Sequence, residues 1–387
     1  MPSEPPDREP PPRPLEGGDD VRAGGGEAPL SGGADSSLSG GGADAGRRDA
    51  PRRRPTIADV ARRAGVSAAA VSFAVNDRPG VSSGTRERIL AAARELGWRP
   101  SASARALTEA RTRAVGLVLA RDAAQLEVDS FFVRFLSGIE RALTAADYAL
   151  LLQLVPGGAG AALPAYERLA AAGRVDGFLL TDVEIDDPRF ALLDGAGVPV
   201  VLAGRPAGEC PFPWVETRHA EGIAAPVEHL AELGHERIGF LGGREEFEHV
   251  REREACWRGA LAAAGLPIGP RVHAAEDLRA AALALLDEGP TAIVCASDVL
   301  AMAAVLAAGS RGLGVPADVS ITGFDDSPLA ALASPALTSV RVDYAEFGEA
   351  ATGALLAQIG GEPAPVYSPS PPALVVRAST APPRRRR

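Results

Sequence analysis

The sequence predicts an α/β protein: a small all-α segment near the N-terminus, then a larger domain of parallel sheets in two lobes. Residues 55–100 contain short helical patterns bounded by glycine and capping residues. From Val115 onward, apolar runs of strand length alternate with Ala/Leu-rich amphipathic stretches, which is typical of βαβ units. The stretch that follows, about 270 residues, exceeds one comfortable hydrophobic core, so we expect it to divide into two lobes.

Charge divides the chain of 387 residues more sharply than its net value of −10 suggests. Residues 1–46 carry −6, residues 47–113 carry +9, and residues 114–387 carry −13. A positive charge confined to one short stretch indicates a nucleic-acid-binding module. All 40 basic residues are arginine, so each cationic phosphate contact would use a planar group with several donors.

Several classes of protein are disfavoured by the composition. No run of 18 uncharged apolar residues occurs, and the first residues lack the apolar stretch of a secretory signal, so we expect a cytoplasmic protein. Cys210, Cys256 and Cys295 are widely spaced, which favours reduced thiols over a disulfide framework. The histidines show no metal-ligand spacing, so we expect neither a metal nor a cofactor.

The segment 1–54 contains nine prolines, eleven glycines and no aromatic residue. Such a composition buries too little surface to offset the entropy of ordering, so we expect a disordered tail. The tail ends in an arginine cluster, which fits either an arm lying on phosphates or a solvated extension without a role: Arg47, Arg48, Arg52, Arg53 and Arg54. A second basic tail is expected at residues 381–387.

The pattern of residues 55–100 predicts three short helices. Thr56 followed by Asp59 is close to a capping box, and Gly65 is suited to end the first helix in a tight turn. Ser67 can cap a second helix that reaches about Val75. A third helix is expected from Thr85 to Leu96. Two helices packed across a tight turn within the arginine-rich stretch predict a helix-turn-helix headpiece, although a purely structural bundle has the same pattern.

Short motifs run through this segment at defined spacing: Thr56 to Ala61, Val66-Ser67, Val71-Ser72, Asn76, Arg78 to Ser82, Thr85-Arg86, Leu96-Gly97 and Arg99-Pro100. Together they resemble the lac repressor (LacI/GalR) family of transcriptional regulators. The resemblance implies a repressor that binds double-stranded operator DNA as a homodimer at a palindrome, and that is nucleoid-associated when bound. It also implies DNA contacts from the headpiece: Thr56, Ser67, Ala68, Ala69, Ser72, Phe73, Asn76 and Arg78.

Three of these residues occupy the positions that choose bases in the family. They are Ala68, Ala69 and Phe73, whereas polar readers are common there. None of these side chains can form a bidentate hydrogen bond with a base, so contact with thymine methyl groups is what remains. We therefore expect discrimination to depend also on Arg78, on DNA shape and on the segment after the headpiece.

Residues 101–113 read as a hinge and linker. The run Ser101 to Leu107 is Ala-rich and too short to be a stable helix alone. The resemblance implies that it folds on DNA, with Arg105 in contact with the duplex and Leu107 wedged between base steps in the minor groove. The alternative is a plain interdomain linker with an incidental leucine.

Residues 114–380 resemble the family's periplasmic-binding-protein-like domain, which holds a ligand between two lobes and carries the dimer interface. The expected strands are Val115–Leu119, Tyr148–Val155, Phe178–Thr181, Val198–Leu202, Ile238–Leu241, Ala292–Ala296 and Ser320–Phe324. The expected helices include Phe131–Ala145, Glu221–Leu233, Glu252–Ala264, Asp298–Arg311 and Tyr344–Ile359. The resemblance depends on motifs such as Leu233 to Ile238, Ala296 to Asp298 and Gly323 to Asp326.

The resemblance places a small-molecule effector, sugar-like in chemistry, on five residues: Phe131, Phe132, Arg253, Asp298 and Asp325. Both aspartates follow the carboxyl ends of strands, where ligands bind in open α/β sheets. A cation and two carboxylates offer directional partners for hydroxyls. Each acid could instead cap the next helix, the two phenylalanines could belong to a lobe core, and Trp214 and Trp257 fit packing better than a ligand platform.

Two departures from the family pattern leave the ligand open. The stretch Glu216 to His219 replaces a usual Asp-x-Asp-Asn, and Cys256 replaces a usual glycine. An architectural DNA protein without ligand control therefore stays an alternative, and an extracytoplasmic solute-binding protein fits less well because of the basic headpiece. No nucleotide-binding or hydrolase motif occurs, so we expect no enzyme.

Overall fold

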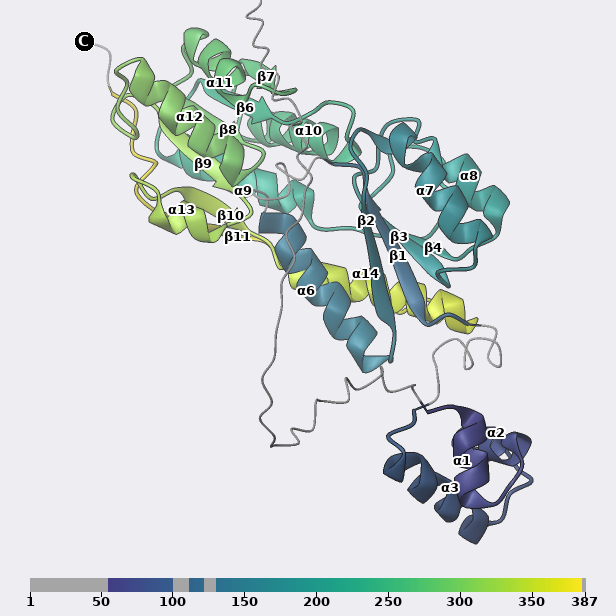
Figure 1. The fold of residues 1–387 in the computed structure, drawn as a ribbon. Helices are drawn as coiled ribbons and strands as arrows, with labels where there is room; N and C mark the ends of the chain where they lie inside the picture. Colours follow the sequence, from purple (N-terminus) through teal and green to yellow (C-terminus); the bar gives the residue numbers. More distant parts are fainter. Residues whose placement is uncertain (1–54, 100–110, 122–129, 385–387) are drawn as a thin grey trace, which may run out of the picture. The chain divides into compact units, whose positions relative to one another are not determined.

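The computed structural model describes residues 55–99, 111–121 and 130–384 (Figure 1). The tail 1–54, the hinge residues Arg105 and Leu107, and residues 385–387 lie outside this part of the chain. None of the helices in the described part combines the length and apolar character needed to span a bilayer.

The headpiece contains the three predicted helices: α1 (Ile57–Ala64), α2 (Ala68–Val75) and α3 (Ser83–Glu95). The Asp59 carboxylate accepts hydrogen bonds from the backbone N–H of Thr56 at 2.9 Å and from its hydroxyl at 2.7 Å. Gly65 ends α1 with a φ of 66°, a left-handed conformation that glycine adopts without strain. The helices enclose a small core centred on the fully buried side chains of Val60, Val71 and Ile89.

The first lobe is a five-stranded parallel sheet in the order β2-β1-β3-β4-β5. Its strands are β1 (Ala114–Leu119), β2 (Ala149–Leu154), β3 (Gly177–Leu180), β4 (Val200–Ala203) and β5 (Trp214–Val215). Helices α6 (Ser130–Ala145) and α14 (Tyr344–Gly360) share one hydrophobic core with the sheet. A second core on the sheet involves α7 (Ala159–Ala171) and α8 (Arg189–Ala196).

The second lobe is a six-stranded sheet in the order β11-β10-β9-β8-β6-β7, in which only the pairing of β10 with β11 is antiparallel. Its strands are β6 (Ile238–Gly242), β7 (Arg271–His273), β8 (Ala292–Cys295), β9 (Ser320–Phe324), β10 (Thr338–Arg341) and β11 (Ala373–Val375). Its helices are α9 (His219–Glu232), α10 (Glu248–Ala263), α11 (Leu278–Asp287), α12 (Asp298–Ser310) and α13 (Pro328–Leu332).

The chain passes between the lobes in several places. It leaves the first lobe between β5 and α9, returns to it between β10 and α14, and ends in the second lobe with β11. Figure 1 shows α14 alongside α6, although α14 follows the strands of the second lobe in the sequence. The lobes are therefore formed from interleaved segments, and the ends of several strands meet between them.

The predicted fold class is confirmed, and each predicted strand matches an observed strand to within about two residues. Four strands were not predicted: β5, β7, β10 and β11. Strand β10 has little apolar periodicity, because its residues Thr338 and Ser339 are fully buried through hydrogen bonds instead of apolar packing, and β11 is an edge strand of three residues. Strands β5 and β7 are edge strands that are too short to show a clear apolar pattern in the sequence.

Candidate functional site

The outer face of α2 carries the residues expected to read DNA. Ala68 and Ala69 are exposed, and Phe73 is 39% exposed although its side chain is aromatic. Ser67 caps the helix by accepting a hydrogen bond from the N–H of Ala70 at 3.2 Å. Ala69 and Phe73 are four residues apart and so share one face of the helix. The described headpiece therefore presents methyl groups and an aromatic ring, without a long polar side chain, on the front of α2.

The end of α2 is fixed by its neighbours. The Asn76 amide donates a hydrogen bond to the Ser72 hydroxyl at 3.4 Å, and both of these predicted contact residues are half-buried. Arg78 is exposed on the turn that follows. The ring of Phe73 lies against Gly80, whose φ of 116° disfavours any other residue. Thr56, the first predicted contact residue, lies at the N-terminus of α1.

A large cavity of about 280 Å³ lies between the two lobes of the second domain. Its walls come from loops at the carboxyl ends of strands, including residues after β1, β3 and β4 in the first lobe. In the second lobe they come from the loops after β6, β7, β8 and β9. This is the location at which ligands bind in open α/β sheets.

One edge of the cavity is closed by the backbone itself. Glu184 of the first lobe and Phe247 of the second form an antiparallel β-bridge. The N–H of Ile185 donates to the carbonyl of Glu246 at 3.0 Å, and the N–H of Glu248 donates to the carbonyl of Val183 at 2.9 Å. The guanidinium of Arg121 lies 5.3 Å from the Phe247 ring centroid on the same edge. The two lobes are thus joined at the mouth of the cavity as well as at the crossovers.

Arg253, on α10, lines the cavity and is 9% exposed. One guanidinium nitrogen donates to the carbonyl of Ala296, and the guanidinium carbon lies 4.1 Å from the centroid of the Phe324 ring. Within the described residues, its buried Nε has no hydrogen-bond partner. A buried donor without an acceptor is costly, so this atom is suited to an acceptor on a bound molecule.

Asp298 lines the cavity and is 2% exposed. It does not cap α12, because Ser297 does so by accepting from the N–H of Leu300 at 3.3 Å. The Asp298 carboxylate instead accepts from the N–H of Ser327 at 2.6 Å and from the hydroxyl of Ser339. Burial raises the pKa of Asp298, and the hydrogen bond from Ser339 opposes that rise only in part.

Asp325 also lines the cavity, at the end of β9. Its carboxylate accepts a hydrogen bond from the hydroxyl of Tyr344 at 2.6 Å, and the N-cap of the next helix, α13, is Ser327. The capping alternative therefore does not apply to Asp325 either. Tyr344 belongs to α14 in the first lobe, so Asp325 is bonded across the cavity.

The two phenylalanines of α6 have different surroundings. Phe131 lines the cavity and packs edge-on against Tyr344, with ring centroids 4.8 Å apart. Phe132 is 2% exposed within the core of the first lobe and is not among the lining residues. Trp257 is fully buried against Phe240, while Trp214 is 47% exposed; neither lines the cavity.

Several lining residues were not expected from the sequence. Arg121 and Asp182 form a bidentate ion pair at 2.6 Å, and they are 61 residues apart in the chain. His219 Nδ1 lies 3.1 Å from a carboxylate oxygen of Glu252. Partial burial beside Arg253 lowers the pKa of His249 to about 3, so this ring is neutral at physiological pH. His219 belongs to the stretch Glu216 to His219, which the sequence singled out as a departure from the family pattern, and Glu216 and Thr217 of that stretch also line the cavity.

One group in the described part of the chain has the donor atoms of a metal site: Glu245, Glu254 and His273. One oxygen of Glu254 already accepts from Arg258 and lies 2.8 Å from Nε of Arg271. The other oxygen lies 2.9 Å from His273 Nε2. The two arginines neutralise the carboxylate that a cation would need, so we interpret the group as an ion-pair cluster.

Comparisons with known proteins agree with both halves of this architecture. Residues 56–101 match the model for bacterial regulatory proteins of the lacI family, and residues 227–380 match a periplasmic binding protein-like domain. The HTH-type transcriptional regulator reg1 of Streptomyces lividans is 36% identical over 348 residues, which cover 84% of this chain and 96% of that protein.

Solved structures show the same similarity. A complex of the transcriptional regulator CelR with cellobiose is 32% identical, covers 84% of this chain and all of its own, and has a TM-score of 0.63. The lac repressor dimer bound to operator and the anti-inducer ONPF is 28% identical, covers 85% of this chain and 100% of its own, and has a TM-score of 0.74.

A helix-turn-helix headpiece followed by a two-lobed domain with an interlobe cavity defines a DNA-binding transcriptional regulator. The chain belongs to the lacI family of bacterial regulatory proteins. Its relatives are named as transcriptional regulators, so it is a regulator and not an enzyme.

Proposed function

We propose that the chain is a repressor that binds a palindromic operator as a homodimer and responds to a small sugar-like effector in the interlobe cavity. A DNA partner implies action in the cytoplasm, on the nucleoid. The observation that carries the proposal is a pair of cavity-lining polar atoms, Arg253 Nε and Thr217 Oγ1. Both are buried and have no hydrogen-bond partner among the described residues. A polyhydroxylated molecule would supply acceptors and donors to both.

The chemistry of the cavity favours a neutral, hydroxyl-rich ligand. Its acids are largely offset by arginines, as in the pair of Arg121 with Asp182. Asp298, Asp325 and Arg253 contribute directional polar atoms, and Phe131 contributes an apolar ring face. Sugars combine hydroxyl edges with apolar C–H faces, and so match such a lining. The similar CelR structure contains cellobiose, which makes this disaccharide a natural first probe.

Homodimer formation is supported by apolar side chains left exposed on the first lobe. Val133 on α6 is 69% exposed, and Leu152 and Leu154 on the edge strand β2 are 43% and 45% exposed. Exposed apolar side chains on an edge strand and on a helix that contacts it are typical of a protein interface. In the dimer, two headpieces would read two half-sites, with Leu107 and Arg105 of each hinge acting in the minor groove.

For base recognition we propose methyl and ring contacts from Ala68, Ala69 and Phe73, supported by polar contacts from Thr56, Ser67, Ser72, Asn76 and Arg78. These side chains suit thymine methyl groups, with DNA shape supplying further discrimination.

The test is selection of bound sequences from a random DNA pool at fixed salt, followed by operator affinity with and without cellobiose and a panel of other sugars. We expect a palindrome of two half-sites and an operator Kd that changes on adding one ligand of the panel. Thermal shift with the same panel should show stabilisation by that ligand. A clear consensus without any responding ligand would instead favour an architectural DNA protein, and the absence of a consensus would contradict specific regulation.

A further inference from the structure

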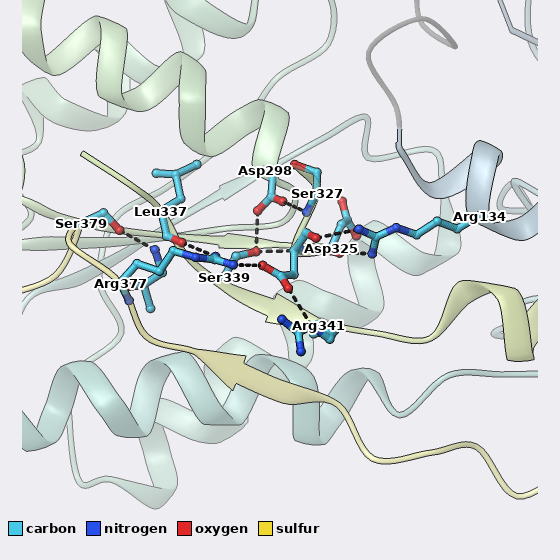
Figure 2. A network of polar contacts seen from close by, with 11 residues as sticks. Arg134, Asp298, Asp325, Ser327, Leu337, Ser339, Arg341, Arg377 and Ser379 are labelled. Atoms are coloured by element: carbon cyan, nitrogen blue, oxygen red, sulfur yellow. Dashed lines mark hydrogen bonds and ion pairs between the residues drawn. The ribbon is translucent and has the colours of Figure 1, made fainter. Parts of the chain in front are cut away.

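The loop after β9, residues 325–327, is bonded to the body of the second lobe through all of its backbone N–H groups, and Figure 2 shows the bond between Ser327 and Asp298. The N–H of Asp325 donates to the carbonyl of Val340 at 2.8 Å. The N–H of Asp326 donates to the Ser339 hydroxyl at 3.1 Å, and that of Ser327 donates to the Asp298 carboxylate at 2.6 Å. The cavity residue Asp298 is therefore part of the support of this loop.

The side chain of Asp326 also bonds the same loop to the second lobe. Its carboxylate accepts from Arg377 at 2.6 Å and from Arg341 at 2.7 Å, and Asp326 is 7% exposed. Burial would raise the pKa of Asp326, but the hydrogen bonds and charges of the two arginines outweigh it and lower the pKa. The second lobe therefore holds the loop through ion pairs to the Asp326 carboxylate as well as through hydrogen bonds from the loop backbone.

From the first lobe, Arg134 of α6 reaches the same loop with both terminal nitrogens (Figure 2). Nη1 donates to the carbonyl of Asp325 at 2.9 Å, and Nη2 donates to the carbonyl of Asp326 at 2.7 Å. The planar guanidinium matches two consecutive carbonyls, a geometry that an ammonium group cannot reproduce. Arg134 is half-buried, and its contact joins α6 to the backbone of the residue that lines the cavity.

The backbone at this contact is in an uncommon conformation. Asp325 has a φ of 106° and Asp326 a φ of 45°, in two consecutive non-glycine residues. Such conformations persist where the surrounding structure holds them, and they cluster at ligand clamps and switch regions. The two carbonyls that Arg134 binds belong to these two residues, so Arg134 is one of the groups that hold the uncommon backbone in place.

We propose that Arg134 is a positioning residue that fixes the Asp325 carboxylate in the cavity and couples the occupation of the cavity to helix α6. The proposal deepens the proposed function and rests on it for the identity of the output, which is operator binding. A ligand that bonds to the carboxylate of Asp298 or Asp325 competes with the hydrogen bonds that these carboxylates already make, and so shifts residues 325–327. Because Arg134 is bonded to the carbonyls of that loop, α6 and the first lobe shift with it, which is the differential contact that coupling requires.

The experiment compares Arg134→Gln with Arg141→Gln in the full chain. Both arginines lie on α6, but Arg141 is exposed and pairs with Glu349, with 3.5 Å between Nε and a carboxylate oxygen. Hydrogen–deuterium exchange is followed in peptides that cover residues 325–327, and operator affinity is measured at fixed salt on the DNA selected above. Affinity for non-specific DNA and the melting temperature report headpiece integrity and overall stability.

We expect Arg134→Gln to accelerate exchange of the loop amides by about tenfold and to change operator Kd by about fivefold or more. Non-specific DNA affinity should stay the same, and Arg141→Gln should match the wild type in both measurements. Arg134→Lys should restore little of the effect, because it lacks the planar fork. A contribution to stability alone would lower the melting temperature but leave operator Kd, measured well below melting, unchanged.

Unchanged exchange at residues 325–327 in Arg134→Gln would overturn the positioning role. Faster exchange with an operator Kd within about twofold of wild type would overturn the coupling to α6. If the wild type selects no DNA consensus, the proposed function fails and the coupling fails with it, whereas the exchange measurement still decides whether Arg134 positions the loop.

Discussion

Arg86 of α3 fixes the turn that carries Arg78 without itself belonging to the outer face of α2. Its Nη1 donates to the carbonyl of Ala74 at 2.8 Å and to the Asp77 carboxylate, and its Nη2 donates to the carbonyl of Arg78 at 3.0 Å. Asp77 has a φ of 52°, so the turn has an uncommon conformation that these bonds stabilise. The orientation of the residues that we propose to read DNA therefore depends on a side chain twelve residues beyond Ala74.

Replacing Arg86 with methionine, which keeps much of the length but no donor, should weaken specific DNA binding. We expect operator Kd to rise by about tenfold or more and affinity for non-specific DNA to fall much less, because the reading turn loses its orientation. Fluorescence anisotropy with specific and scrambled duplexes measures both. Arg88→Met, at an exposed position of the same helix, is the matched control for loss of charge. Equal losses on both duplexes in Arg86→Met would show that the residue acts only through its charge.

His249 should make the stability of the chain depend on pH. Its pKa falls from 6.5 to about 3 in the fold, so between these values the unfolded chain binds more protons than the folded one. Stability should then be lost as pH falls below about 6.5. At about pH 5 the contribution of this ring amounts to at most about 2 kcal/mol.

Urea unfolding of wild type and His249→Gln at about pH 7.5 and about pH 5 tests this dependence. The difference in free energy of unfolding between the two pH values should be smaller in the variant. Parallel losses in the two proteins would assign the pH dependence to other groups.

The sequence predicted the position of some cavity residues and not of others. Arg253, Asp298 and Asp325 follow strand ends or lie on the helix after one, so pattern and resemblance together brought them to the cavity. The pair of Arg121 with Asp182 lies 61 residues apart in the chain, and only the register of β1 beside β3 brings it together. Phe131 and Phe132 lie in the first turn of α6, where the phase of the helix decides which ring faces the cavity and which faces the core, and sequence periodicity does not resolve that choice for adjacent aromatic residues.

At the scale of elements, α6 and α14 approach each other through a pair of glycines. A Cβ on Gly138 would lie less than 3.0 Å from the backbone of Ala345, and one on Gly348 less than 3.0 Å from the backbone of Phe135. The two helices therefore touch backbone to backbone. Since α14 follows β10 of the second lobe, this contact fixes the crossover to the first lobe.

Gly138→Ala should destabilise the protein by about 3 kcal/mol, because the added methyl meets backbone that cannot move aside. Gly353→Ala is the control on α14, since its Cβ meets no atom within 4 Å. That substitution should stabilise by about 0.5 to 1 kcal/mol through helix propensity. Urea unfolding gives both values, and a loss below about 0.5 kcal/mol in Gly138→Ala would show that the helices can separate at little cost.

Among elements, those with strong apolar periodicity were predictable and those defined by their neighbours were not. Strand β9 follows a continuous apolar and small-residue run and was predicted from Ser320 to Phe324, as observed. Strand β10 is buried through Thr338, which donates its N–H to the hydroxyl of Ser379 at 2.8 Å. Ser379 lies 41 residues from Thr338 in the chain, so the local sequence around β10 does not predict this hydrogen bond or the strand that it stabilises.

For the whole molecule, charge separates the DNA-binding segment from the domain that holds the proposed ligand site. The stretch 47–113 carries +9, whereas residues 114–387 carry −13. Attraction to phosphates is thus confined to the headpiece and its flanks, while the larger domain repels DNA. Long-range attraction between such charges is screened by salt, but hydrogen bonds within a partly enclosed cavity are screened much less.

Raising monovalent salt from about 50 mM to about 200 mM should weaken operator binding by on the order of a thousandfold, because bound counterions are released from the DNA. Binding of a neutral sugar in the cavity should change by less than about threefold over the same range. Anisotropy and calorimetric titrations provide the two dissociation constants. A comparable salt dependence of both would indicate a charged effector in place of a sugar.

The backbone bridge at the mouth of the cavity has a kinetic consequence. While the N–H of Ile185 is bonded to the carbonyl of Glu246, and that of Glu248 to the carbonyl of Val183, this edge offers no passage to a ligand of sugar size. Entry on this side requires these bonds to open first, so association by this route should reach a plateau as the concentration of the proposed effector rises. The height of that plateau equals the opening rate, which would set the shortest time in which the regulator can respond through this route to a sudden change in the concentration of the proposed effector.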